Sequence, residues 1–229
     1  MSNKVALVTG STSGIGLGIV KKFAQENYDI VINGFANKAE IQDITAELKQ
    51  SGANEIHYSD ADLTKPKEIK QIFEVIDKKF AKLDVLVNNA GMQFVAPIDE
   101  FPDEKWEQII RLNLISSFYT IKGAIPLMKK NKFGRVINIA SAHALVASPF
   151  KSAYVAAKHG LLGLTKTAAL EVAKENITVN AICPGYVKTP LVLSQIADTA
   201  KSRGISEEEV IENVILGAQA TKKFVEIDE

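Results

Sequence analysis

Two side chains one helical turn apart can move a proton near neutral pH. Tyr154 and Lys158 occupy positions i and i+4 of a helix-forming stretch at 152–174, so on a helix both point to the same side. A tyrosine hydroxyl alone is a poor base, with a pKa of about 10, and a neighbouring ammonium stabilises the phenolate. The spacing predicts that Tyr154 pairs with Lys158, and not with Lys151, in proton transfer to or from an alcohol. Ser152 is predicted to cap the helix.

Two other polar residues complete a candidate catalytic set. Ser141 follows an apolar run at 134–140 that is typical of a strand, so its hydroxyl can bond a reacting oxygen at the strand end. Asn113 lies within a helical stretch, a place that asparagine does not favour. Each residue alone has an ordinary structural interpretation, but the combination of Asn113, Ser141, Tyr154 and Lys158 favours a catalytic one.

A glycine-rich segment supplies a candidate phosphate site. TGSTSGIG at 9–16 follows the first apolar run and opens a helix. Glycines at 10, 14 and 16 permit a tight turn, and the N–H groups at the helix start can bind a pyrophosphate. A glycine triplet alone also fits an ordinary strand–helix turn. NNAG at 88–91, after another apolar run, strengthens the prediction of a dinucleotide site.

These residues need a scaffold of alternating strands and helices. Strands are predicted at 4–9, 29–34, 55–59, 83–88, 134–140 and 177–183, with helices at 15–26, 38–50, 65–80, 103–130 and 152–174. Such alternation predicts an α/β fold, a Rossmann-type doubly wound parallel sheet with helices on both faces. We expect a single domain over 1–229. Residues 187–220 are predicted to form a lid of two helices, with a break between them near SRGIS at 202–206.

The composition narrows the class of protein. The 229 residues include 27 basic and 27 acidic ones, and this balance argues against a nucleic-acid partner. No apolar run reaches the ~18 residues of a membrane span. The apolar run near the N-terminus is too short for a signal peptide. One cysteine, Cys183, and three unpaired histidines predict no metal site and a cytoplasmic location.

The motifs together identify a family. TGxxxGxG, NNAG, Asn113, Ser141, Tyr154-x-x-x-Lys158 and PG at 184–185 have the order and spacing of the short-chain dehydrogenase/reductase family, and the resemblance spans essentially the whole chain. It implies a nicotinamide cofactor and hydride transfer between an alcohol and a ketone, with Asn113 binding a water that links Lys158 to solvent. The implied cofactor-binding residues are Gly10, Thr12, Gly14, Ile15, Gly16, Phe35, Asp62, Leu63, Asn89, Ala90, Gly91, Tyr154, Lys158, Pro184, Gly185, Val187 and Thr189.

The choice between NAD and NADP depends on the end of the second strand. An acid there binds the ribose 2′-hydroxyl of NAD, but the sequence reads Asn33-Gly34-Phe35. An arginine to pair with a 2′-phosphate is equally absent from this place and from the glycine loop, and Lys38 is the nearest cation. We predict NAD, with Phe35 packed against the adenine.

The resemblance is closest to family members that interconvert (R)-3-hydroxybutyrate and acetoacetate. It implies that the substrate carboxylate is bound by Gln93, His143, Lys151 and Gln195. A buried carboxylate needs a cation and neutral donors. His143, two residues beyond Ser141, points the same way if the segment is extended. Tyr186 is expected to form a wall of the pocket.

Other activities remain open. A 3-oxoacyl-carrier-protein reductase shares the fold and the catalytic residues, and a non-catalytic dinucleotide-binding protein shares the fold. The resemblance also implies a further helix and a seventh strand beyond KKFVEIDE. We therefore expect six strands in this chain, an unpaired edge on the sixth, and a homotetramer where that C-terminal part is present.

Overall fold

The computed structural model describes residues 3–229, which build one sheet of six parallel strands. The strand order is β3-β2-β1-β4-β5-β6, and β1 pairs in register with β2 and β4. The strands are β1 (Val5–Val8), β2 (Asp29–Asn33), β3 (Ile56–Ser59), β4 (Val85–Asn88), β5 (Gly134–Ile139) and β6 (Ile177–Ile182). The Rossmann-type fold and the six predicted strands are confirmed.

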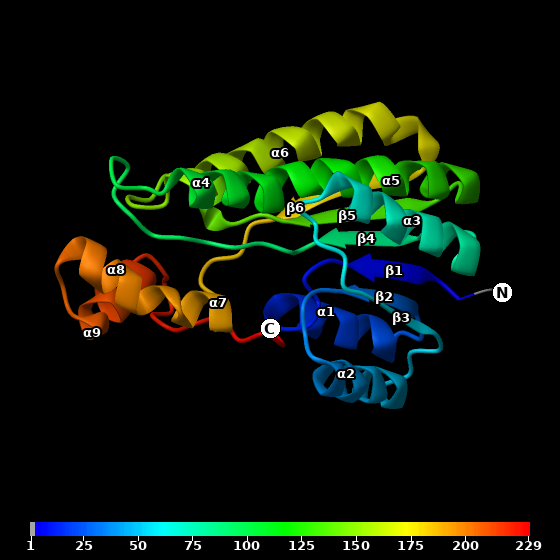
Figure 1. Ribbon diagram of the computed structural model, residues 1–229, viewed down its shortest axis with the longest axis horizontal. Coiled ribbons are helices and arrows are strands. Elements are labelled where there is room, and N and C mark those ends of the chain that lie inside the picture. Colours follow the sequence, from blue (N-terminus) through cyan, green and yellow to red (C-terminus); the bar gives the residue numbers. More distant parts are fainter. Residues whose placement is uncertain (1–2) are drawn as a thin grey trace.

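Helices cover both faces of the sheet (Figure 1). Helices α1 (Gly14–Gln25) and α2 (Lys38–Gln50) pack on one face, and α3 (Pro66–Phe80), α5 (Ser116–Asn131) and α6 (Ser152–Val172) pack on the other. The strands are apolar along their length because their side chains enter a core on each face. Leu7 and Leu86 belong to one of these cores, and Val8 and Val87 to the other.

The long helix predicted at 103–130 is interrupted. It consists of α4 (Asp103–Ile110), a π-helical turn η1 (Arg111–Ile115) and α5. A π-turn adds one residue to a helical turn, and the apolar periodicity used for the prediction does not detect it. The interruption carries Asn113. Two short 3₁₀ helices, η2 (Ala142–Ala144) and η3 (Ala173–Glu175), follow β5 and α6.

The predicted lid forms a separate helical group beyond the carboxyl ends of the strands (Figure 1). It contains α7 (Pro190–Leu193), α8 (Gln195–Arg203), α9 (Glu207–Glu209) and a π-helical segment η4 (Val210–Ile215). The predicted break occurs at Gly204, whose φ is +66°. Ile196, Ala200, Val210 and Ile215 form a small core of their own. Within residues 3–229, no helix is both long and apolar enough to cross a membrane.

Candidate active site

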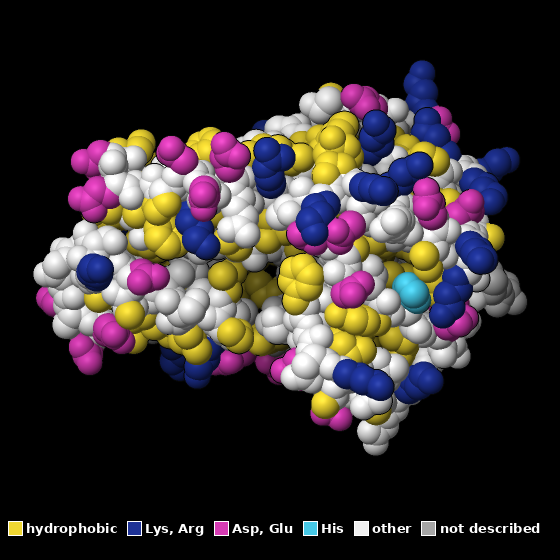
Figure 2. Space-filling model, in the orientation of Figure 1, with side chains coloured by type: hydrophobic (Ala, Val, Ile, Leu, Met, Phe, Trp, Pro, Cys, Tyr) yellow, Lys and Arg dark blue, Asp and Glu magenta, His cyan; other side chains and the backbone are white. Residues whose placement is uncertain are grey.

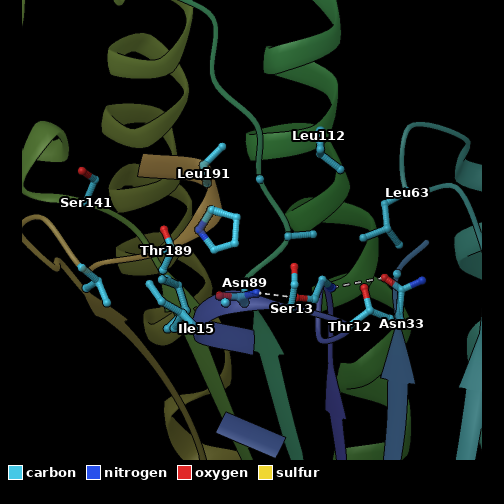
Figure 3. Close-up of a pocket in the computed structure, with 18 of the residues that line it drawn as sticks. Thr12, Ser13, Ile15, Asn33, Leu63, Asn89, Leu112, Ser141, Thr189 and Leu191 are labelled. Carbon is cyan, nitrogen blue, oxygen red and sulfur yellow. Dashed lines mark hydrogen bonds between the residues drawn. The ribbon is translucent and has the colours of Figure 1, made fainter. Parts of the chain in front are cut away.

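A pocket of about 500 Å³ runs along the carboxyl ends of the strands. Figure 3 shows Ser141 at one side of it and Asn33 and Leu63 at the other, so the pocket is elongated across the sheet edge. In the space-filling view, the surface is hollowed between the α7–α9 group and the rest of the molecule (Figure 2). Every residue predicted to bind the cofactor lines this pocket except Gly16.

The glycine turn is shaped by backbone constraints. Gly10 and Gly14 have φ angles of +61° and +53°, which side chains rarely adopt, and a Cβ on Gly10 would lie 2.8 Å from the Cα of Ala90. Gly16 is buried under the turn, where a Cβ would collide with the carbonyl oxygen of Gly10. Gly16 therefore permits the close packing of α1 on the turn and does not itself line the pocket.

The start of α1 is open to an anion. Ser13 occupies the N-cap position, but its side chain makes no capping hydrogen bond, and it is exposed and lines the pocket. The first N–H groups of a helix have no partner within the helix. A phosphate can therefore bind them here without displacing a side chain.

Hydrogen bonds hold the walls at this end of the pocket. Asn89 Nδ2 donates to the carbonyl oxygens of Thr9 and Gly10, each at 3.0 Å. Asn33 Nδ2 donates to the carbonyls of Ser59 at 3.2 Å and Ala61 at 3.0 Å. Asn33 stands at the end of β2, where an acid would bind the ribose of NAD, and it instead ties the end of β2 to the chain that follows β3. Phe35 is 74% exposed beside it.

Tyr154 and Lys158 meet at the other end of the pocket. Lys158 Nζ donates to the carbonyl of Ile139 at 2.7 Å and lies 5.5 Å from the centroid of the Tyr154 ring. Burial lowers the pKa of Lys158 to about 8. Burial raises the pKa of Tyr154, and a hydrogen bond with Ser141 opposes this shift. The expected lowering of the Tyr154 pKa is not seen in the protein alone, because desolvation outweighs the stabilisation of the phenolate.

Asn113 is buried and does not line the pocket. Its Oδ1 accepts from Met92 N and its Nδ2 donates to Met92 O, both at 2.9 Å. The side chain thus ties the π-turn to the loop after β4. With both amide atoms engaged there, the predicted water link from Asn113 to Lys158 remains a prediction.

Four of the five residues predicted to bind the substrate contact one another or the catalytic tyrosine. Lys151 Nζ donates to Gln195 Oε1 at 3.2 Å and lies 5.5 Å from the Tyr186 ring centroid. The His143 ring packs edge-on against Tyr154 and Tyr186, with centroids 6.4 and 6.0 Å apart. None of the five residues lines the 500 Å³ pocket. The cluster adjoins the pocket through the contact of His143 with Tyr154, which does line it.

The prediction that the segment from Ser141 to His143 is extended was wrong. Residues 142–144 form the 3₁₀ helix η2 and not an extended segment, and the hydroxyl of Ser141 accepts a hydrogen bond from His143 N at 3.1 Å. The turn brings the ring to Tyr154. Burial and then the charge of Lys151 lower the pKa of His143 to about 4. The imidazole is therefore neutral at physiological pH.

Gln93 and Ser152 have buried polar atoms without partners. Both amide atoms of Gln93 and the hydroxyl of Ser152 lack a hydrogen bond. Ser152 is the first residue of α6, and Lys151 takes the N-cap position predicted for it. The loop that carries Gln93 is joined to this region by a bond from Ala96 N to the carbonyl of Phe150 at 3.0 Å. Buried polar groups of this kind are uncommon in folded proteins, so they mark this region as a candidate place for a bound ligand.

Some residues with reactive side chains lie elsewhere. His159 is exposed, and its Nδ1 lies 2.9 Å from the carbonyl of Val155. His57 lies on β3, an edge strand of the sheet. No group of three or more potential metal ligands occurs in the described part of the chain. Sequence reasoning missed Arg203, which approaches the cluster from the end of α8.

The family is decided by comparison with known proteins. The family model for short chain dehydrogenase matches residues 4–200. The chain belongs to this family. It is thus a short-chain oxidoreductase with a site for a nicotinamide dinucleotide.

Its relatives and a solved structure agree with this assignment. The chain is 56% identical over 226 residues to the D-beta-hydroxybutyrate dehydrogenase of Rhizobium meliloti (strain 1021), covering 99% of this chain and 88% of that protein. The protein of the same name from Cupriavidus necator is 47% identical over 230 residues, covering 100% of this chain and 88% of that protein. A 3-oxoacyl-[acyl-carrier-protein] reductase of Staphylococcus epidermidis is 34% identical over 205 residues, covering 90% and 83%. An actinorhodin polyketide ketoreductase variant with NADPH superposes with a TM-score of 0.90 at 32% identity, over 99% and 86% of the chains.

Proposed function

We propose that this dehydrogenase interconverts (R)-3-hydroxybutyrate and acetoacetate with NAD as cofactor. One observation carries the proposal: Lys151 is a buried cation whose hydrogen-bond partner is a neutral amide, and it lies over the ring of Tyr186, which His143 joins to Tyr154 of the catalytic pair. The names of the two most identical relatives cited above support the same substrate.

The chemistry of the cluster suits a small carboxylate. Lys151 is only 7% exposed, and burying a charge without a counter-ion costs free energy. Burial, with the charge of Arg203, lowers the pKa of Lys151 to about 8, so the ammonium is still formed at neutral pH. A substrate carboxylate would provide the missing counter-ion, and Gln195, His143 and Gln93 would add neutral donors.

The geometry around Tyr154 supports a proton transfer in the proposed reaction. In the direction of oxidation, Tyr154 accepts the proton of the substrate hydroxyl while Ser141 donates a hydrogen bond to the reacting oxygen. A hydrogen bond to Ile139 O holds the Lys158 ammonium beside the Tyr154 ring, where it would stabilise the phenolate against the burial that raises the pKa of Tyr154. Asn113 positions Met92 and thereby the loop that carries Gln93.

The elongated pocket fits a nicotinamide dinucleotide. The uncapped start of α1 and the turn at Gly10 would hold the pyrophosphate, Asp62 and Leu63 would flank the adenine, and Thr189 would hold the carboxamide. The cofactor, when bound, accepts or supplies the hydride. Among the described residues, the charged side chains that line the pocket are Asp62 and Lys158. Asp62 is paired with Lys65 at 3.4 Å, and no lysine or arginine lines the adenosine end of the pocket in the described part of the chain. The lack of a lining cation favours NAD over NADP, whose 2′-phosphate needs one.

One assay tests the proposal. We expect NADH formation with (R)-3-hydroxybutyrate and NAD, with little turnover of the S enantiomer and little with NADP. Turnover of acetoacetyl thioesters with NADPH, and none of the free acid, would instead favour a carrier-protein reductase. Cofactor binding without any turnover would favour a non-catalytic protein. The homotetramer and the cytoplasmic location remain predictions, which gel filtration and cell fractionation test.

A further inference from the structure

The buried polar atoms without partners are concentrated around one short segment. In residues 3–229 such side-chain atoms belong to Gln93, Ser152 and Arg203. Ser152 directly follows Lys151, and Phe150 directly precedes it. The guanidinium carbon of Arg203 lies 5.5 Å from the centroid of the Phe150 ring. Gln93 lies on the loop bonded to the carbonyl of Phe150. Three separate parts of the chain therefore present unsatisfied polar groups near residues 150–152.

Arg203 also brings a second positive charge to this place. Its charge contributes to the lowered pKa of Lys151 and opposes the upward shift of the pKa of Tyr186. No ion pair joins Lys151 or Arg203 to a carboxylate in the described part of the chain. Two like charges in partly desolvated surroundings repel each other. An anion bound between them would remove this repulsion.

Helix α8 is held against the segment at both of its ends. Gln195, its first residue, accepts the hydrogen bond from Lys151, and Arg203, its last residue, stacks near Phe150. The guanidinium is planar and matches a carboxylate with two parallel N–H groups. Its buried Nε lacks a hydrogen bond, so one donor of that pair is available to a ligand.

We propose that Arg203 is a second cationic substrate-binding residue, which receives the substrate carboxylate together with Lys151 and so couples carboxylate binding to the docking of α8. The proposal rests on the proposed function for the identity of the substrate. It adds a determinant on the lid that the resemblance did not include.

The test compares Arg203→Gln with a matched control on the same helix. Lys201→Gln removes an exposed charge two residues away. With Arg203→Gln we expect KM for (R)-3-hydroxybutyrate to rise about tenfold or more, because the substrate carboxylate loses a charge-assisted hydrogen bond. The values of kcat, KM for NAD and KM for the uncharged methyl ester of the substrate should change by less than about threefold. Lys201→Gln should leave all four near the wild-type values.

Two results would overturn the assignment. If KM rises equally in Lys201→Gln, the overall charge of the lid, and not Arg203 itself, determines substrate binding. If KM for the methyl ester rises equally in Arg203→Gln, the variant has lost packing and not a contact with the carboxylate. Arg203→Lys keeps the charge without the planar fork, so we expect a smaller rise in KM than for Arg203→Gln. Should Arg203→Gln fail to fold, as judged by its melting curve, Arg203→Lys carries the test, and an unchanged KM in that variant counts against the proposal.

Butyrate separates failure of this inference from failure of the proposed function. It carries the carboxylate and cannot react, so its binding to the wild-type protein with NAD is measured by calorimetry. If Arg203→Gln weakens butyrate binding about tenfold or more, the carboxylate site is supported even where (R)-3-hydroxybutyrate is not turned over. If both proteins bind butyrate equally, the inference is wrong whatever the substrate.

Discussion

The two ends of the active-site cleft are built differently. At the end formed by the glycine turn, the polar side chains of Asn33 and Asn89 are used within the protein, and each bonds loops that follow neighbouring strands. At the end formed by α8 and residues 141–152, Gln93, Ser152 and Arg203 keep buried polar atoms without partners. At the first end these side chains are satisfied within the protein, and the groups left open are backbone N–H groups at the start of α1. At the second end the open groups belong to side chains.

We propose from this difference that the first end binds the cofactor that the family shares and that the second end selects the substrate. A turn made of backbone contacts and internal hydrogen bonds can hold the same dinucleotide whatever the substrate. Buried charges and hydrogen-bond donors without partners destabilise the folded protein until a ligand of matching charge binds. Specificity against analogues without that charge follows, because such analogues leave the buried groups unsatisfied. Tyr154 lies where the two ends meet.

The largest effect is expected from Tyr154→Phe, which tests this junction. The change removes the hydroxyl that exchanges the proton, and kcat should fall by about 10² to 10⁴, the usual contribution of general acid–base catalysis. Binding of NAD and of butyrate should remain within a few-fold of wild type, because each end of the cleft is intact. Steady-state kinetics and calorimetry measure the two quantities.

Tyr28→Phe is the control, since Tyr28 packs against Phe23 just before β2 and far from the carboxyl ends of the strands. Its turnover should equal that of wild type. A comparable loss in Tyr28→Phe, or loss of both binding events in Tyr154→Phe, would contradict a local role for the hydroxyl.

A smaller effect is expected from Lys151→Met, which breaks only the substrate end. The change removes a buried cation while keeping a chain of similar length, and KM for (R)-3-hydroxybutyrate should rise about 10- to 100-fold, the size of a charged hydrogen bond of about 1.5–3 kcal/mol. The affinity for NAD should not change. Kinetics with both substrates varied gives the two constants.

Lys166→Met is the matched control on α6, because that lysine is exposed. It should behave as wild type. Loss of NAD affinity in Lys151→Met would mean that the lysine belongs to the cofactor end, and the contrast between the two ends would fail.

Gly16→Ala tests the completeness of the cofactor end through stability. A Cβ would lie 2.5 Å from Asn89 Nδ2 and would collide with the Gly10 carbonyl, and overpacking of this kind costs about 1–3 kcal/mol. The free energy of unfolding in urea should fall by that amount, with weaker NAD binding. Gly163→Ala, on the exposed face of α6 with no atom within 4 Å of the added methyl, should instead raise stability by about 0.5–1 kcal/mol. Equal effects of the two changes would refute the argument.

The cofactor end could be predicted from the sequence because its determinants are local. The spacing of Gly10, Gly14 and Gly16 and the i, i+4 pair of Tyr154 and Lys158 specify backbone turns and a helix face directly. The π-turn at 111–115 was missed because Asn113 is held by Met92, a contact between segments far apart in the sequence. A single residue added to a helical turn leaves little trace in the apolar pattern.

The substrate end could be predicted only in part. A resemblance to relatives suggested Lys151 and Gln195, and the structure brings them together across the lid. Arg203 has no such signal, since a lone arginine near the end of a polar helix is usually solvated or favoured there by the helix dipole. Its stacking on Phe150 depends on how α8 docks, and Ser152 lost its predicted capping position because the helix begins at that residue.

The smallest effect is the pH dependence of carboxylate binding, which sharpens the comparison by isolating one charge. The pKa of Lys151 is about 8 in the protein without substrate, so the ammonium is present below pH 8 and is lost above it. The dissociation constant of butyrate should be flat from about pH 6 to 7.5 and rise above pH 8, approaching tenfold per pH unit, because one proton must be regained for binding.

No inflection is expected near pH 6.5, because His143, with a pKa of about 4, is neutral throughout this range. Lys158 also titrates near pH 8, but it does so equally in wild type and Lys151→Met. Calorimetry on both proteins therefore isolates Lys151: the rise above pH 8 should be absent in the variant, and an identical rise in both would assign the titration to the catalytic end of the cleft.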